Sequence, residues 1–290
     1  MIMDYITKIK ANITIYASKK TSNILDGEYT SIYKGRSMDF DDLREYVIGD
    51  DVKDIDWKSS IRSGKTLVRR FIAEKKHNIL LVLDSEKKML ADTANNESKK
   101  ELAILSAGTI AYLAHKHGDE IGAVYSKENY TKFFNYKTTL FNLEMILQNY
   151  NKDVQANNGN INTSLNFIIK NIKRKSIIVI VTDLDGLDKL QEETIKRLSV
   201  IHDILIINIS DASLTCKNAF DIDAGSYIPE LILQDSKLID NEKRDKEETY
   251  KRCMEKFKKY KITVVTISQR KEIVQKIIEL LERHKHANIS

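Results

Sequence analysis

The stretch "LLVLDSEKKMLAD", residues 80–92, runs a short apolar segment into an aspartate and then into a charged turn. Its first four residues are Leu or Val, which is typical of a strand buried on both faces of a sheet. The next stretch, "SKKELAILSAGTIAYLAHKHG" (98–118), has apolar residues at helical spacing, with Ser98 near its start and Gly118 at its end. A buried strand followed by an amphipathic helix is the basic unit of an α/β fold.

This unit recurs along the chain. Buried strands are expected at 176–183, 203–210 and 261–268. The polar spacer "KEN" between 120–126 and 130–136 predicts an antiparallel hairpin. Further helices are expected at 138–150, 162–172, 190–202 and 271–284. The pattern predicts an α/β protein with a doubly wound, mostly parallel six-stranded sheet.

The composition agrees with a globular protein of regular elements. The 290 residues are 42% apolar and include one proline and ten glycines. The 47 basic and 42 acidic residues are interspersed, so the net charge of +5 does not indicate nucleic acid binding. The apolar runs are too short to span a bilayer, and the two cysteines have no paired spacing. We therefore expect a cytoplasmic protein without a transmembrane segment.

The first 77 residues differ from the rest of the chain. We expect an N-terminal segment and a small β-rich module within 1–77, followed by the α/β domain at 78–290. The stretch "GRSMDFDDLREYVIGDDVKDIDWKSSIRSGKTLVRRF" (35–71) alternates arginines with aspartates, which favours ion pairs within a compact unit. Gly49 is expected in a turn, and Trp57 is expected to seat the module on the sheet.

Two aspartates mark the predicted carboxyl edge of the sheet. Asp84 and Asp183 each end a buried strand, and ligands of doubly wound sheets bind at this edge. Thr163, just before a predicted helix, is a third candidate for the same crevice. Two carboxylates and a hydroxyl form an all-oxygen set that suits Mg²⁺.

These residues resemble the metal-ion-dependent adhesion site of von Willebrand factor A domains, which has the form DxSxS, then Thr, then Asp. Asp84, Thr163 and Asp183 match that motif, whereas Glu86 and Lys88 replace its two serines. A lysine ammonium repels a divalent ion and can neutralise the aspartates itself. We therefore predict a degenerate site in which Lys88 replaces the cation, with no cofactor. Glu86 leaves Mg²⁺ binding as the alternative.

The N-terminal module carries a second resemblance. It is similar to the signature of the domain of unknown function fifty-eight family, whose members contain a von Willebrand A-like domain. The matching residues are Gly35, Arg36, Phe40, Leu43, Arg44, Tyr46, Gly49, Asp50, Asp51, Ile55, Asp56, Trp57, Lys58, Arg62 and Met89. The resemblance implies a protein-interaction or adaptor role beside a MoxR-type AAA+ ATPase. The residues expected to bind the partner or to stabilise the module are Arg36, Arg44, Asp50, Asp51, Asp56, Trp57, Lys58 and Arg62.

Two hydrolase patterns are the alternatives to a binding protein. Asp183 and Asp185 have the spacing of a phosphatase DxDxT motif, with Leu187 in place of the threonine. Asp54, Asp56 and Lys58 resemble the core of a Mg²⁺-dependent nuclease. No nucleophile, base and orienting group have a recognisable spacing, and no glycine-rich phosphate loop follows a strand. The sequence thus favours a non-catalytic protein over a Mg²⁺-dependent hydrolase.

Overall fold

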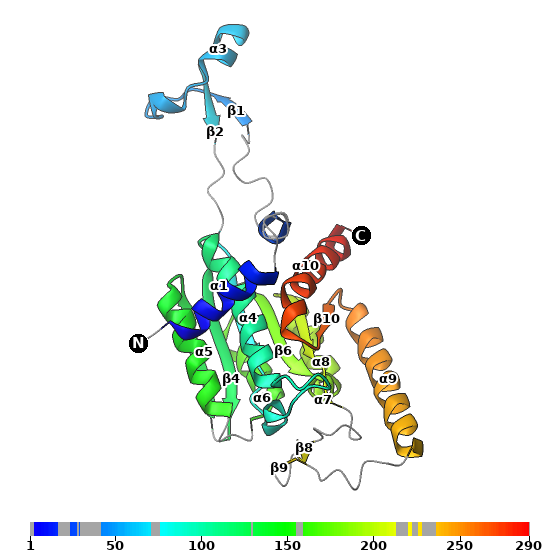
Figure 1. The fold of residues 1–290 in the computed structure, drawn as a ribbon. Helices are drawn as coiled ribbons and strands as arrows, with labels where there is room; N and C mark the ends of the chain where they lie inside the picture. The colour runs from blue at the N-terminus through cyan, green and yellow to red at the C-terminus, as the bar shows by residue number, and fades with distance from the viewer. Residues whose placement is uncertain are drawn as a thin grey trace.

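A computed structural model describes residues 3–16, 24–27, 29, 42–70, 76–128, 130–154, 159–212, 220–221, 226–227 and 236–289. These residues form a six-stranded sheet in the order β10-β7-β6-β3-β4-β5, in which β5 alone is antiparallel to its neighbour (Figure 1). The strands are β3 (Asn78–Leu83), β4 (Glu120–Lys127), β5 (Tyr130–Lys137), β6 (Ile177–Asp183), β7 (Asp203–Ile209) and β10 (Thr263–Ile267). The predicted doubly wound, mostly parallel sheet and its antiparallel hairpin are confirmed.

Helices cover both faces of the sheet. The larger helices are α1 (Asp4–Tyr16), α4 (Lys99–Lys116), α5 (Leu140–Val154), α6 (Ile161–Asn171), α9 (Ser236–Lys258) and α10 (Ile273–Ile289). The shorter elements are η2 (Lys87–Leu90), α7 (Leu184–Lys189), α8 (Glu192–Ser199), η4 (Arg270–Glu272), β8 (Phe220–Asp221) and β9 (Ser226–Tyr227). Helices α1, α4, α5 and α10 share one apolar core, and α6, α8 and α9 share the other.

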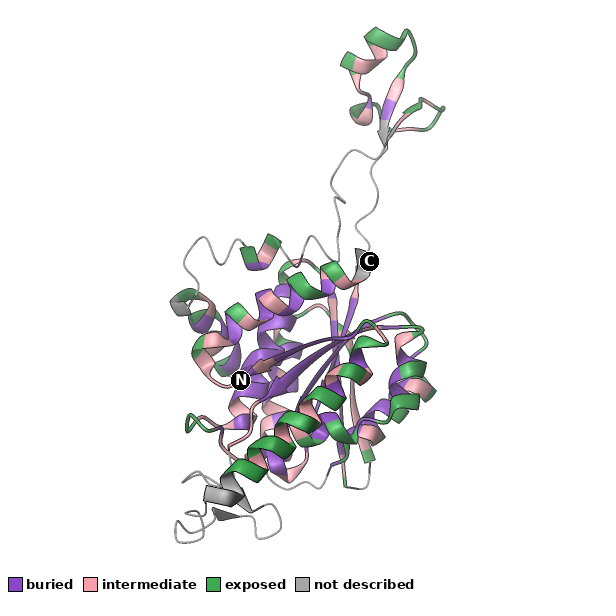
Figure 2. Ribbon diagram, turned by 90° about the vertical axis from the view of Figure 1, so that its right-hand side faces the viewer, coloured by how far each residue is buried: buried purple, intermediate pink, exposed green. Residues whose placement is uncertain are grey.

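The central strand explains why two cores form. All six residues of β3 are buried, like most of the sheet in Figure 2. The alternating residues Ile79 and Leu81 join one core, while Leu80 and Val82 join the other. A continuous apolar run is therefore required here instead of an apolar-polar alternation.

Among the described residues, no helix is long and apolar enough to cross a membrane.

Helix α1 belongs to the first of these cores, although the sequence assigned residues 1–77 to a separate N-terminal part. The buried carboxylate of Glu144 accepts hydrogen bonds from the backbone N–H groups of Tyr5 and Ile6, at 3.1 and 2.9 Å. Ile9 packs so closely on Gly108 that a Cβ there would lie 2.4 Å from the Ile9 side chain. The carboxylate satisfies N–H groups that the helix start leaves unpaired, so α1 is fixed at one end.

The N-terminal module contains a two-stranded antiparallel sheet of β1 (Asp42–Glu45) and β2 (Leu67–Arg70). Between the strands lie η1 (Val52–Asp54) and the short helix α3 (Trp57–Ser63), which begins after Asp56 and ends at Gly64. The expectation that Trp57 packs on the main sheet is corrected, because its side chain is 61% exposed. Its position at the start of an exposed helix explains the difference. Arg36 lies outside the described residues.

Candidate functional site

Asp84 and Asp183 lie side by side at the carboxyl edge of the sheet. Strands β3 and β6 are parallel neighbours, and the Asp84 N–H donates to the Val181 carbonyl at 3.0 Å. Both aspartates are buried. Asp183 also caps α7, because its carboxylate accepts a hydrogen bond from the Gly186 N–H at 2.9 Å. The sheet topology therefore brings together two carboxylates that are separated by 99 positions in the sequence.

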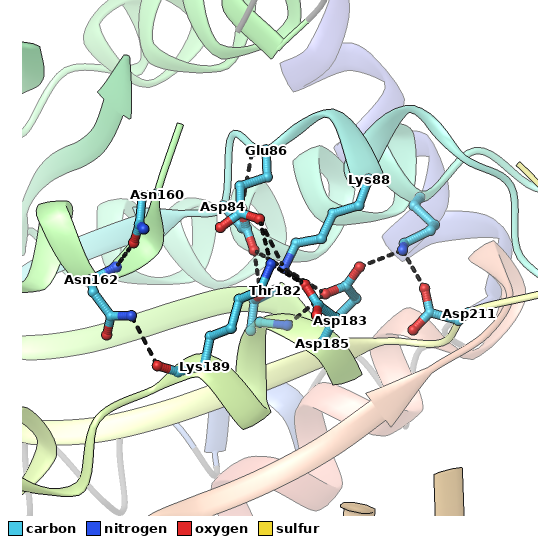
Figure 3. Close-up of polar contacts among 12 residues, drawn as sticks. Asp84, Glu86, Lys88, Asn160, Asn162, Thr182, Asp183, Asp185, Lys189 and Asp211 are labelled. Carbon is cyan, nitrogen blue, oxygen red and sulfur yellow. Dashed lines mark hydrogen bonds and ion pairs between the residues drawn. The ribbon is translucent and has the colours of Figure 1, made fainter. Parts of the chain in front are cut away.

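The ammonium of Lys88 occupies the space between these carboxylates (Figure 3). Its Nζ atom lies 3.1 Å from Asp84 Oδ2 and 3.0 Å from Asp183 Oδ1, and it donates to Asp185 Oδ2 at 2.9 Å. The lysine is only 3% exposed and projects from η2, the short helix that follows β3. Three close carboxylates match the three hydrogens of an ammonium group.

A second buried lysine, Lys99, extends the charge network. It lies in the first turn of α4, and its Nζ atom donates to Asp183 Oδ2 at 2.5 Å. The same ammonium contacts Asp211, just beyond β7. Lys99 and Asp211 were not identified from the sequence, because neither belongs to a recognisable motif. Asp183 is thus held between two ammonium groups that come from different parts of the chain.

Thr182, and not Thr163, supplies the hydroxyl of the site. The Thr182 Oγ1 atom donates to Asp84 Oδ2 at 2.5 Å, and the side chain is buried. Thr163 is exposed on the first turn of α6, and no contact found among the described residues joins its side chain to the cluster. The expectation for Thr163 is therefore corrected. The buried Tyr150 hydroxyl adds a bond to the Asp84 carbonyl oxygen at 2.5 Å.

The outer part of the cluster is formed by Glu86, Asp185 and Lys189. The Lys189 Nζ atom lies 3.1 Å from Glu86 Oε2 and 2.7 Å from Asp185 Oδ2. Asp185 and Lys189 are about half exposed, whereas Glu86 is mostly buried and lies 3.6 Å from the Lys88 ammonium. Asp185 and Lys189 therefore form most of the part of the cluster that solvent and a partner can reach.

Close packing at Gly186 holds the site together. A Cβ atom at this position would lie 1.8 Å from Thr182 Oγ1, 2.8 Å from Asp84 Oδ2 and 2.9 Å from Lys88 Nζ. Only a glycine lets the first turn of α7 approach the buried polar atoms so closely. The glycine after Asp185 therefore has a steric role in the charge network.

The protonation states follow from burial and charge. Burial alone would lower the pKa of Lys88, but the carboxylates of Asp84 and Asp183 outweigh it and hold the pKa well above its ordinary value. Burial would raise the pKa of Asp183, but Lys99 and Lys88 hold it below its ordinary value. For Glu86, burial and the nearby Asp84 raise the pKa. Lys88 is therefore protonated and Asp183 is ionised at neutral pH.

The cluster carries more negative than positive charge. Five carboxylates (Asp84, Glu86, Asp183, Asp185, Asp211) face three ammonium groups (Lys88, Lys99, Lys189), so the formal charge of the cluster is −2. The excess is expected to act on a partner mainly near Asp185, because this carboxylate is half exposed whereas Asp84 and Asp183 are buried.

The arrangement does not fit a bound magnesium ion. A cation shared by Asp84 and Asp183 would have to occupy the place of the Lys88 ammonium. Within the described part of the chain, no group of three or more His, Cys, Asp or Glu side chains could hold a metal ion. The residues described above therefore form a network of ion pairs that links β3, β6, η2, α4 and α7.

Neither hydrolase pattern has the geometry that its chemistry requires. Asp183 and Asp185 both bind the Lys88 ammonium, so neither is an unpaired nucleophile or base. The nuclease pattern needs its residues on a strand, but Asp54 ends η1 and Asp56 caps α3 through a bond from the Ser59 N–H. Lys58 lies on α3 and is exposed.

Among the other signature residues, Arg44 pairs with Asp50 at 2.5 Å across the turn that follows β1. Asp51 caps η1 by accepting a bond from the Lys53 N–H at 3.0 Å. Arg62 is exposed on α3. These residues therefore divide into a group that stabilises turns and helix ends and a group that faces solvent.

The strand order and the antiparallel edge strand define a doubly wound, mostly parallel α/β domain, with paired aspartates at the carboxyl edge of its sheet. The family described as "Protein of unknown function DUF58" matches residues 42–215, and the chain belongs to this family. The resemblance identified from the sequence is confirmed.

The chain is similar to uncharacterized proteins of mycobacteria. It is 23% identical over 202 residues to Rv1480 of Mycobacterium tuberculosis, and to Mb1516 of Mycobacterium bovis with the same figures. The match covers 69% of this chain and 63% of each relative.

Similar solved structures include a conserved hypothetical protein, BatB from Bacteroides thetaiotaomicron, at 12% identity and a TM-score of 0.42. That match covers 71% of this chain and 99% of BatB. A von Willebrand factor type A protein from Catenulispora acidiphila is 9% identical with a TM-score of 0.41, covering 75% of this chain and 43% of that chain.

Proposed function

We propose that the chain is a non-catalytic protein-interaction protein, an adaptor or partner of a MoxR-type AAA+ ATPase. In this proposal, the lysine Lys88 permanently replaces the metal of an adhesion-type site. The supporting observation is that its ammonium lies within 3.1 Å of Asp84, Asp183 and Asp185. The choice of this ATPase as the partner rests on the resemblance to the family alone.

The charge network supports a binding role for physical reasons. A bound Mg²⁺ keeps exchangeable waters that a ligand can replace, whereas an ammonium has three hydrogens and here faces three carboxylates. The Lys88 ammonium therefore has no free hydrogen for a partner. The accessible acidic group is Asp185, with the mostly buried Glu86 beside it, and the formal charge of −2 favours a basic partner surface.

Binding to the ATPase tests the proposed partner. The purified chain is titrated into the MoxR-type ATPase of the same genome in nucleotide buffer, and the affinity is measured by calorimetry. We expect a complex that Asp185→Asn and Glu86→Gln each weaken by roughly tenfold, because each removes an edge charge. The matched control is Glu192→Gln, which removes an exposed carboxylate at the start of α8 that is paired with Lys259 and does not belong to the cluster. If no complex forms, the ATPase is not the partner.

Magnesium tests the assignment of Lys88. We expect millimolar Mg²⁺ to leave the Tm of the wild type unchanged. Replacing the lysine by Lys88→Ser should create a site that Mg²⁺ stabilises by about 1.4 kcal/mol at ten times Kd. A saturable Tm increase in the wild type, or Mg²⁺-dependent phosphoester hydrolysis that Asp185→Asn abolishes, would contradict the proposed function.

A further inference from the structure

The N-terminal module exposes apolar side chains that it has no core to bury. Between residues 43 and 68, the buried apolar side chains are Ile55 and Val68. The same segment exposes five large apolar side chains: Val47, Ile48, Val52, Trp57 and Ile61. Exposed and half-buried residues dominate the module, whereas buried residues dominate the sheet of the α/β domain (Figure 2). Units of fewer than about 40 residues seldom have enough core of their own, so this one is expected to gain stability from a contact.

Helix α3 arranges part of this surface in two stripes. Trp57 and Ile61 are four residues apart, so they lie on one face of the helix, and both are exposed, by 61% and 81%. Lys58 and Arg62 have the same spacing and form the neighbouring stripe. Tryptophan and arginine are the residues that most often dominate the binding energy of protein interfaces.

Some charged side chains of the module form ion pairs with each other, and others do not. Within the described residues, Lys58 and Arg62 have no ion-pair partner, and neither do Asp51 and Asp54 of η1. Other charges of the module do pair: Arg44 with Asp50, and Lys65 with Glu45. The elements η1 and α3 are separated along the chain only by Ile55 and Asp56. Their residues Asp51, Val52, Asp54, Trp57, Lys58, Ile61 and Arg62 are together called the α3 face below. It combines a basic pair, an acidic pair and apolar side chains.

We propose that two copies of this chain associate through the α3 face in a two-fold symmetric contact. Such a contact requires a surface that complements itself. In the dimer, Trp57 and Ile61 pack against the same residues of the second copy. The basic pair, Lys58 and Arg62, faces the acidic residues Asp51 and Asp54 of the second copy. The inference does not depend on the proposed function of the α/β domain.

The charge balance favours a second copy over a polyanion. Residues 42–70 contain seven basic and six acidic side chains, so the formal charge is only +1. A surface for nucleic acid or for an anionic membrane would carry a clear excess of basic residues. The exposed carboxylate of Asp51 and the half-buried carboxylate of Asp54 would repel both. Opposite charges on one small surface are what a self-complementary interface needs.

Sedimentation velocity of the full chain tests the association. From about 1 to 100 µM we expect a monomer to dimer transition, as mass action requires. Trp57 is the only tryptophan of the chain, so its emission should shift to the blue as the dimer buries it. Trp57→Ser should raise the dimer Kd by about 30-fold or more. The matched control, Val200→Ser, alters an 81% exposed apolar residue of the α/β domain and should leave Kd unchanged.

A charge-swap experiment tests the two-fold arrangement itself. The double variants Lys58→Glu/Arg62→Glu and Asp51→Lys/Asp54→Lys should each be monomeric, because like charges meet at both ends of the contact. In an equimolar mixture opposite charges meet again, so a dimer of one copy of each variant should form. That rescue would also show that both variants fold.

Three results would overturn the proposal. A wild type that stays monomeric to about 100 µM, well above the Kd of a specific dimer, excludes the contact. A wild-type dimer that Trp57→Ser leaves intact places the interface elsewhere. Monomeric double variants that do not associate on mixing exclude the pairing of the basic residues with the acidic ones.

Discussion

The cluster of charged side chains around Lys88, called the Lys88 cluster below, and the α3 face differ in the environment of their charged residues. In the cluster, Asp84 and Asp183 are buried and each contacts at least one ammonium. On the α3 face, Lys58 and Arg62 are exposed and unpaired within the described residues, and the apolar Ile61 is exposed beside them. Charges removed from water must be paired, whereas exposed charges need not be. The difference indicates that the cluster stabilises the domain internally and that the α3 face is available for a contact.

The largest effect is expected from removing the central cation. Lys88→Met leaves the buried carboxylate of Asp84 without its close ammonium and removes one of the two ammonium partners of the buried Asp183. Breaking a buried ion pair by removing one partner costs about 3–5 kcal/mol, and urea unfolding should show a loss of that size. The control is Lys189→Met, which removes a half-exposed cation of the same cluster and should cost less than about 1 kcal/mol. Equal losses in the two variants would contradict the central role of Lys88.

The second-largest effect is expected at acidic pH, which should reduce the stability that the ion pairs of the cluster provide. The pKa of Asp183 is lowered in the folded state by Lys99 and Lys88, against the effect of burial, and the pKa of Asp185 is lowered by Lys189 and Lys88. A lowered carboxyl pKa stabilises the fold above the unfolded pKa, and this contribution is lost as the pH falls below about 4 toward the folded pKa. One paired aspartate contributes roughly 2–3 kcal/mol in this way.

The raised pKa of Lys88 sets the upper pH limit of the range in which the cluster stabilises the fold. The pKa of Lys88 is raised in the folded state, so its contribution is complete below the unfolded pKa of about 10.4 and is lost only as the pH rises further. The raised pKa of Glu86 has the opposite sign and offsets part of the acid loss. Urea unfolding should thus show a plateau from about pH 5 to pH 10 for these groups. Constant stability down to pH 3 would show that the aspartates are not paired.

Thr163 and Thr182 show why the sequence located the site but did not identify the hydroxyl group that contacts Asp84. Asp84, Lys88 and Asp183 were identified because strand ends and a motif-like spacing mark them. Thr163 matched the order of that motif, yet its side chain faces solvent from α6, while Thr182 directly precedes Asp183 on the buried end of β6. Motif order does not specify how a loop and a helix start are oriented, and here the tertiary arrangement decides which hydroxyl reaches Asp84.

Exchanging each hydroxyl for a methyl group distinguishes these two residues. Thr182→Val leaves Asp84 Oδ2 without its 2.5 Å hydrogen bond in a buried position, which should cost about 2 kcal/mol. The same exchange at the exposed position, Thr163→Val, should change the free energy of unfolding by less than about 0.5 kcal/mol. Chemical denaturation of the two variants measures the difference. A larger loss at position 163 would return Thr163 to the site.

Other parts of the cluster left no signal that sequence reasoning could use. Lys99 lies one residue after the helix start at Ser98 and looks like a surface lysine of an amphipathic helix, yet it is 2% exposed and contacts Asp183 and Asp211. The docking of α1 depends on Glu144, which is 138 positions or more away from the N–H groups that it binds. Strand patterns determined the sheet because burial follows the local alternation, whereas these long-range polar contacts depend on the assembled fold.

The smallest effect is expected on the α3 face when the chain is monomeric. Ile61→Ser alters a side chain that is 81% exposed, so the free energy of unfolding should change by less than about 0.5 kcal/mol. Val68→Ala removes buried atoms from β2 and should destabilise the module by about 1–2 kcal/mol. Trp57 reports the module alone and far-ultraviolet circular dichroism reports mainly the α/β domain, so the two transitions can be followed separately. Destabilisation of the monomer by Ile61→Ser to the same extent as by Val68→Ala would mean that Ile61 packs within the module, and the contrast between the α3 face and the Lys88 cluster would no longer hold.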